Sequence, residues 1–207
     1  MSFDRVAPHY HWLESVVFGQ QLQEARIAFL NEIASPRRVL VVGEGNGRFL
    51  AQFVRLYPEA AVDSIETSGR MIELAKRRVG RANVRHVRSD IREIVLRPNS
   101  YDLLVTHFFL DCFEEASLSF VITKLANSAA RHAQWLIADF CRPPKDWRHL
   151  RGRFLIALMY RFFRVVSGIE ARQLVDYRPL LRLEGFELGR KTLSPDEMIR
   201  TELWERE

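Results

Sequence analysis

The sequence predicts an α/β fold: a doubly wound sheet of seven strands, mostly parallel, with helices on both faces and one antiparallel strand near the C-terminus. One observation behind this prediction is that short apolar runs alternate with segments of helical periodicity along the 207 residues. Such alternation is typical of parallel strands joined by crossover helices. A second observation is that the last two strands are joined only through Ser194 and Pro195. That connection is too short for a crossover helix, so these two strands should pair antiparallel.

The individual elements follow from apolar periodicity and from the positions of proline. One or two amphipathic N-terminal helices should end near Ser35, because Pro36 cannot continue a helix. Further helices are expected at 48–57, 68–79, 114–131 and 171–183. Strands are expected at 38–42, 61–65, 84–87, 101–106, 134–139, 185–190 and 198–204. We therefore expect a single domain over 1–207, with a helical cap at 1–35 and an insertion at 142–169.

Composition excludes several classes of protein. A hydrophobic content of 47% and a mean hydropathy of −0.15 are ordinary for a globular domain. Cys112 and Cys141 are the two cysteines, and neither a CxxC motif nor a zinc-like histidine spacing accompanies them, so no disulfide framework and no metal site is expected. Residues 1–7 lack the basic-then-apolar layout of a secretory signal, which favours a cytoplasmic location.

A glycine-rich loop, Gly43-Glu44-Gly45-Asn46-Gly47, stands between the first predicted strand and the following helix. Glycine allows a tight turn and a close approach of ligand to backbone, and the helix N-terminus offers free amides, so a nucleotide-like ligand is indicated. A plain strand-to-helix turn is the alternative. The third glycine arrives one residue too early for the G-x-G-x-x-G dinucleotide fingerprint, with Arg48 in the next position.

Polar residues follow the second and fourth predicted strands. Glu66 lies 19 residues beyond Gly47, where its two carboxylate oxygens could accept both hydroxyls of a ribose. Thr106, His107 and Asp111 lie at the carboxyl end of the fourth strand, the edge where ligands bind in open α/β sheets. His107 is either a base or hydrogen-bond donor, or a packed strand-end histidine. Asp111 could hold an amine or a water molecule.

The G-x-G-x-G spacing resembles that of class I S-adenosylmethionine-dependent methyltransferases, which have a Rossmann-like fold. Glu66 followed by Ser68, Met71 and Ala75 resembles their pattern after the second strand, and the opening Phe3 to Tyr10 is similar to bacterial small-molecule enzymes of quinone biosynthesis. The resemblance implies that S-adenosylmethionine is bound by Gly43, Glu44, Gly45, Asn46, Gly47, Glu66, Thr67, Met71, Asp90, Ile91, Thr106 and His107.

The resemblance also implies roles for particular residues. Asp90 would accept a hydrogen bond from the adenine amino group, with Ile91 packed on the ring, unless Asp90 is a solvent-facing turn residue. Tyr10 would close over cofactor or substrate, and the catalytic residues would be His107, Asp111 and Tyr10. The expected reaction is methyl transfer to a small, apolar or lipid-like acceptor, with no metal ion.

One residue departs from the family pattern. The acid usually found two residues before the first glycine is replaced by Val41, and either Glu44 takes over its contact with the methionine amino group or the contact is absent. Val41 is the one feature that favours a noncatalytic, methyltransferase-like binding partner. A nicotinamide (NAD)-dependent oxidoreductase is a third hypothesis, which the early third glycine disfavours.

The basic residues concentrate in one segment. From Arg142 to Arg164 there are seven cations against one anion, and apolar residues recur at helical spacing through 154–169. This segment is predicted to be a lid over the acceptor pocket, or an interfacial helix that contacts an anionic membrane surface through 147–169. Its longest uncharged run, Phe154 to Tyr160, is too short to span a membrane. Nucleic acid is disfavoured, since no stacking platform accompanies the charges.

Overall fold

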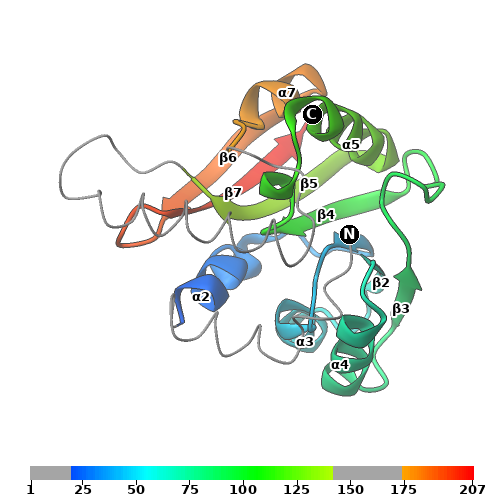
Figure 1. Ribbon diagram of the computed structural model, residues 1–207. Helices are drawn as coiled ribbons and strands as arrows, with labels where there is room; N and C mark the ends of the chain where they lie inside the picture. Colours follow the sequence, from blue (N-terminus) through cyan, green and yellow to red (C-terminus); the bar gives the residue numbers. More distant parts are fainter. Residues whose placement is uncertain (1–19, 142–173) are drawn as a thin grey trace.

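The computed structural model describes residues 20–141 and 174–207, which form a seven-stranded sheet in the order β3-β2-β1-β4-β5-β7-β6 (Figure 1). Strands β1 to β5 run parallel to one another, and β7 pairs antiparallel with both β5 and β6. The predicted fold class is therefore confirmed, including the antiparallel pairing of the last two strands. The strands are β1 Arg38–Val42, β2 Ala61–Glu66, β3 Val84–Arg88, β4 Tyr101–His107, β5 Ala129–Phe140, β6 Phe186–Leu193 and β7 Ile199–Arg206.

Helices cover both faces of the sheet, with α3 and α4 on one side and α5 and α7 on the other (Figure 1). Alternate side chains of β1 show why both faces need covering, because Val39 and Val41 belong to one apolar core whereas Leu40 and Val42 belong to another. All four side chains are buried, as expected for an inner parallel strand. The helices are α2 Gln21–Ile27, η1 Leu30–Glu32, α3 Arg48–Leu56, α4 Gly69–Val79, η2 Leu110–Cys112, α5 Glu115–Ser128 and α7 Arg178–Leu183.

Two predicted helix boundaries were wrong, and the strand expected at 134–139 begins five residues earlier, at Ala129. The helix expected at 114–131 ends at Ser128, because Ala129 pairs with Tyr101 and begins a long β5. Of the helix expected at 171–183, residues 174–177 are not helical, and α7 begins at Arg178. Pro179 occupies the first turn of α7, where its missing N–H costs nothing, so the proline marks the start of the helix rather than its interior.

Several predictions lie outside the described residues. Tyr10 and the first part of the helical cap fall in 1–19, and the whole insertion 142–169, with its basic segment, falls in 142–173. Within residues 20–141 and 174–207, no helix is both long and apolar enough to cross a membrane.

Candidate cofactor-binding site

A pocket opens at the carboxyl ends of β1, β2 and β4. Strand order reverses between β1 and β4, and ligands of open α/β sheets bind at such a reversal. The structure brings ten of the predicted cofactor-binding residues together in the lining of this pocket: Gly43, Glu44, Gly45, Asn46, Glu66, Thr67, Met71, Asp90, Ile91 and His107.

The glycine loop takes a backbone conformation that side chains rarely adopt. Gly43, Gly45 and Gly47 have φ angles of 72°, 67° and 81°. A Cβ atom on Gly47 would lie 2.7 Å from the Cα atom of Ala75, so the loop packs directly on helix α4. A Cβ atom on Gly45 would meet no protein atom within 4 Å. Gly47 is therefore required by packing, whereas Gly45 leaves open space in the pocket wall.

Glu66 connects the end of β2 with the glycine loop. Its Oε2 accepts a hydrogen bond from the Gly45 amide at 3.1 Å, and its Oε1 accepts one from the Ser68 amide at 2.9 Å. A carboxylate offers about four acceptor positions, and the Thr67 hydroxyl also donates to Oε1 at 3.3 Å. Oε2 therefore keeps an open position for a ligand hydroxyl, and Oε1 gains one when the Thr67 hydroxyl rotates away. Ser68 in turn caps α4 by accepting from the Met71 amide. The carboxylate of Glu66 is thus held in a fixed orientation beside the loop.

Glu44 lies buried at the N-terminus of α3. Its Oε1 accepts hydrogen bonds from the amides of Phe49 at 3.0 Å and Leu50 at 3.2 Å, which satisfies two of the free donors of the helix. Burial raises the pKa of the Glu44 carboxyl to about 7, although the nearby Arg26 guanidinium and the two amides act in the opposite direction. Glu44 can therefore gain or lose a proton close to neutral pH.

Asp90 and Ile91 lie just beyond the end of β3. The Asp90 carboxylate forms an ion pair with Arg92, with Oδ2 2.6 Å from Nη2 and Oδ1 3.0 Å from Nε. This ion pair, which outweighs the effect of partial burial, lowers the pKa of Asp90, so the side chain is an anion at neutral pH. Arg92 donates to both oxygens of Asp90, so fewer acceptor positions remain for an adenine amino group. Ile91 is buried and also lines the pocket.

His107 ends β4 inside the pocket. It is 4% exposed, and the Phe49 ring meets it edge-on with centroids 4.7 Å apart. Neither imidazole nitrogen has a hydrogen-bond partner among the residues that the structure describes. Burial, assisted by the charge of Arg26, holds the pKa of His107 well below its usual value, so the imidazole is neutral at pH 7. A neutral imidazole with an unused nitrogen can accept a proton or a hydrogen bond from a ligand.

Three predicted residues are absent from the lining of the pocket. Thr106 is buried, and its Oγ1 accepts a hydrogen bond from the Trp135 indole at 3.0 Å within the core. Gly47 lies against α4, as described above. Asp111 belongs to the short helix η2, where its Oδ1 lies 3.5 Å from the Cys112 thiol.

Asp139, at the end of β5, positions the turn that follows β4. Its Oδ1 accepts a hydrogen bond from the Phe109 amide at 2.9 Å. The preceding residue, Phe108, has a φ of 52°, a conformation that side chains other than glycine rarely adopt. Burial, together with the charge of Asp111, raises the pKa of Asp139 well above its usual value. The turn that carries Phe108 and Phe109 into the pocket is therefore strained, and the hydrogen bond to Asp139 of β5 keeps it in place.

Several other residues that line the pocket were not predicted from the sequence. Arg26 comes from α2, where it is buried and its guanidinium carbon lies 5.0 Å from the centre of the Phe108 ring. No local pattern marks Arg26, because its place depends on α2 packing against β5, β7 and α3. The run of aromatic residues after β4 was a usable signal for Phe109 and Phe113, which stack edge-on at 5.1 Å. The remaining ones are Val42, Ile65, Ser89, Arg92 and Cys112.

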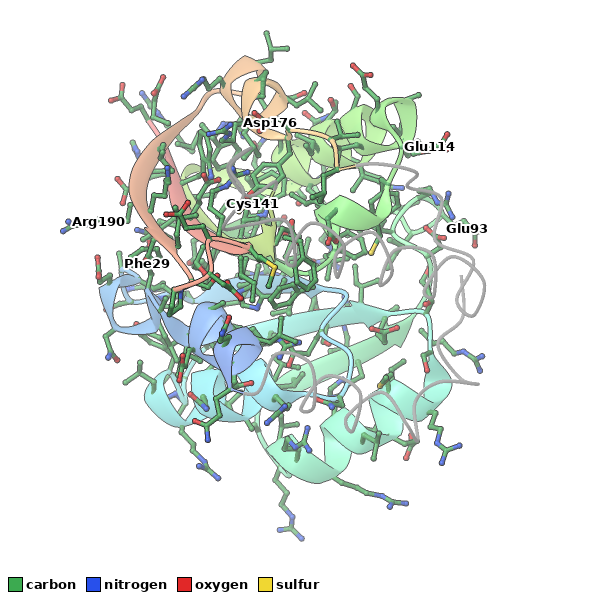
Figure 2. All side chains as sticks on the ribbon, turned by 60° about the vertical axis from the view of Figure 1, so that its left-hand side comes forward. Phe29, Glu93, Glu114, Cys141, Asp176 and Arg190 are labelled. Atoms are coloured by element: carbon green, nitrogen blue, oxygen red, sulfur yellow. The ribbon has the colours of Figure 1, made fainter. Side chains whose placement is uncertain are left out.

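The cysteines form no disulfide. Cys141, near the centre of Figure 2, donates its thiol to the Glu197 carbonyl at 3.2 Å. Burial raises the pKa of the Cys112 thiol well above its usual value, so this pocket residue is a poor nucleophile. Among the described residues, no three His, Cys, Asp or Glu side chains converge as a metal site would need.

Comparison with known proteins identifies the fold. A sequence model described as a methyltransferase domain matches residues 39–140. A magnesium protoporphyrin IX methyltransferase from Synechocystis, solved with bound S-adenosylhomocysteine, superimposes with a TM-score of 0.64 at 18% identity, covering 91% of this chain and 83% of that one. An S-adenosylmethionine-dependent methyltransferase from Mesorhizobium loti gives a TM-score of 0.67 at 15% identity, covering 90% and 98%. Residues 39–140 thus match a methyltransferase domain, and the fold is that of S-adenosylmethionine-dependent methyltransferases.

The curated relatives share a narrower name. A malonyl-[acyl-carrier protein] O-methyltransferase from Priestia megaterium is 33% identical over 112 residues, which is 54% of this chain and 38% of that protein. The protein of the same name from Halalkalibacterium halodurans is 30% identical over 76 residues, 35% of this chain and 28% of that protein. This chain thus spans well under half the length of the curated relatives that it matches.

Proposed function

We propose that this protein transfers the methyl group of S-adenosylmethionine to an oxygen atom of a small acceptor with an apolar body. The observation that carries this proposal is the composition of the pocket. One part of its lining is polar and built from the glycine loop and Glu66, and another part is aromatic and surrounds the neutral imidazole of His107. The names of the two curated relatives support oxygen as the acceptor atom.

The polar part fits the cofactor. Glu66 would accept the two ribose hydroxyls, Asp90 would contact the adenine amino group, and Ile91 would pack on the adenine ring. The methionine end of the cofactor carries both an ammonium and a carboxylate group. Glu44 and Arg26 lie close enough to influence each other's charge, and both line the pocket. Glu44 would bind the ammonium and Arg26 the carboxylate, so the absence of an acid at position 41 is compensated.

The aromatic part fits the acceptor. Phe108, Phe109 and Phe113 line the pocket, and the Phe108 ring also packs on Phe140 with centroids 5.1 Å apart. When bound, the cofactor supplies a methyl group on a positively charged sulfur. The protein then needs mainly to position the acceptor oxygen and to exclude water. His107 would take the proton that an acceptor hydroxyl releases, because its imidazole is neutral and neither of its nitrogens has a hydrogen-bond partner in the part of the chain that the structure describes.

The segment at 142–169 and Tyr10 complete the proposal. We propose that 142–169 closes the acceptor pocket, and that a lipid-like acceptor would bring its residues 147–169 to a membrane surface. Tyr10 would close over the bound ligands. A quinone-type phenol is one acceptor compatible with the aromatic lining.

The proposal is tested by measuring release of S-adenosylhomocysteine in the presence of alkylphenols, medium-chain carboxylic acids and alkylamines. We expect turnover with a phenol or a carboxylic acid. With a phenol, whose hydroxyl must lose its proton, His107→Ala should lower kcat about 10²-fold, the usual contribution of a general base, and change the Kd of S-adenosylmethionine less than about twofold. A carboxylic acid is already ionised at neutral pH, so its turnover should not need this base.

His132→Ala serves as the matched control, because His132 is exposed on β5. It should leave both quantities unchanged. Turnover with alkylamines alone would contradict an oxygen acceptor. Unchanged kcat with a phenol in His107→Ala would remove His107 from the reaction.

A further inference from the structure

The connection between β3 and β4 differs from the other crossovers of the sheet. Helices α3, α4 and α5 join β1 to β2, β2 to β3 and β4 to β5, whereas residues 89–100 contain turns but no α-helix. Glu93, labelled in Figure 2, marks this connection at the periphery of the molecule. On the face that α5 covers over β4 and β5, the outer strands β2 and β3 therefore lack a helix of their own.

A second cavity, of about 270 Å³, lies at this place. Its sheet side is formed by two neighbouring pairs of β2 and β3, Asp63 beside Arg85 and Ile65 beside Val87. The connection supplies Ile94, Val95, Leu96 and Arg97, and the first residues of β1 and β4 supply Arg38 and Tyr101. Ile65 also lines the cofactor pocket, but none of the charged residues is shared between the two sites.

The charge of this cavity is unbalanced. Arg85 contacts Asp63 through two hydrogen bonds of 2.7 and 3.0 Å, and the Tyr101 hydroxyl donates to the same carboxylate at 2.7 Å. Asp63 is thereby fully engaged, and its single negative charge also acts on Arg38, which lies close enough to lower the pKa of Asp63. One negative charge therefore stands against the three guanidinium groups of Arg38, Arg85 and Arg97. Neither Arg38 nor Arg97 forms an ion pair with any residue that the structure describes. Two positive charges therefore remain beside the cavity.

The lining combines these charges with apolar surface. Val95 is 92% exposed, and Ile94 and Leu96 flank it on the connection. Exposure of a large aliphatic side chain beside two unpaired guanidinium groups favours a ligand that has both an anionic and an apolar part. Guanidinium groups match phosphate oxygens in geometry, and a phosphate monoester carries close to two negative charges at pH 7.

We propose that this cavity binds a small phosphate monoester, with the phosphate group between Arg38 and Arg97 and the ester group against Ile94, Val95 and Leu96. The cavity is slightly below the size range of pockets for drug-sized ligands, so the ligand is smaller than a nucleotide cofactor. This site is separate from the methyl-transfer site and does not depend on the function proposed for it.

Calorimetric titration of the full chain with phenyl phosphate, at low ionic strength, tests the proposal. We expect saturable binding to the unsubstituted protein and at least tenfold weaker binding to the double variant Arg38→Gln/Arg97→Gln. Arg131→Gln is the matched control, since Arg131 is an exposed arginine at the start of β5, and it should bind phenyl phosphate within twofold of the unsubstituted protein.

Titration of the same three proteins with S-adenosylmethionine separates folding from ligand recognition, because all three should bind it equally. Absence of saturable binding of phenyl phosphate to the unsubstituted protein would overturn the proposal. Equal affinity in the double variant, or equally tight binding of uncharged phenol, would also overturn it.

Discussion

At the scale of single residues, the pocket depends on a few polar groups whose surroundings set their charge. That Gly43, Gly45 and Glu66 lie together could be predicted from spacing alone, because these residues lie at or just after the ends of β1 and β2. Arg26 could not be predicted, since it reaches the pocket only through the packing of α2 on distant strands. The charge state of Glu44 was equally inaccessible, because burial determines it.

Glu44 should make the stability of the ligand-free protein depend on pH. Its pKa in the folded state, about 7, is above the usual 4.5, so the folded state retains the proton longer than the unfolded state. Stability should therefore fall as the pH rises from 4.5 to 7. A shift of this size corresponds to about 3 kcal/mol, and Glu44→Gln should gain about that much relative to the unsubstituted protein between pH 4 and pH 8.

Urea unfolding of both proteins at pH 4 and pH 8 measures this difference. All other groups titrate alike in the two proteins, so their contributions cancel in the difference between the two free energies of unfolding. A stability difference between the two proteins that is the same at both pH values would show that Glu44 is not held as a buried acid.

At the scale of elements, periodicity predicted most helices and strands, but contacts between elements set some of their ends. Residues 129–131 continue a helical pattern in sequence, yet pairing of Ala129 with Tyr101 makes them part of β5. The glycine loop is also constrained by its neighbours, because Gly47 packs on Ala75 of α4. Because the loop approaches α4 this closely, position 75 needs a side chain as small as that of alanine.

Gly47→Ala and Gly45→Ala should differ in stability. Both substitutions place a side chain in a left-handed conformation, at a cost of about 1 kcal/mol. Only the Gly47 variant also forces a Cβ atom against the backbone of α4, which should cost about 2 kcal/mol more. Thermal or urea unfolding without ligand compares them, and equal destabilisation would contradict the packing of the loop on α4.

At the scale of the whole molecule, the order of the strands places the glycine loop, Glu66 and His107 around one pocket. These residues are far apart in sequence and end three different strands, β1, β2 and β4, whose carboxyl ends meet where the strand order reverses. The sequence predicted this arrangement because the alternation of strands and helices determines a parallel sheet. The cavity beside the β3–β4 connection was not predicted, since charge balance there depends on which arginine reaches Asp63.

The central claim, a cofactor site for S-adenosylmethionine organised by Glu66, is tested most directly by calorimetric titration of the full chain and of Glu66→Ala with S-adenosylmethionine. Glu73→Ala is the control, because Glu73 is an exposed acid on α4 that forms an ion pair with Lys76 and does not line the pocket. We expect the unsubstituted protein and Glu73→Ala to bind S-adenosylmethionine, and not NAD, with equal affinity, and Glu66→Ala to bind it at least tenfold more weakly. Absence of binding to the unsubstituted protein, or unchanged affinity in Glu66→Ala, would contradict the account.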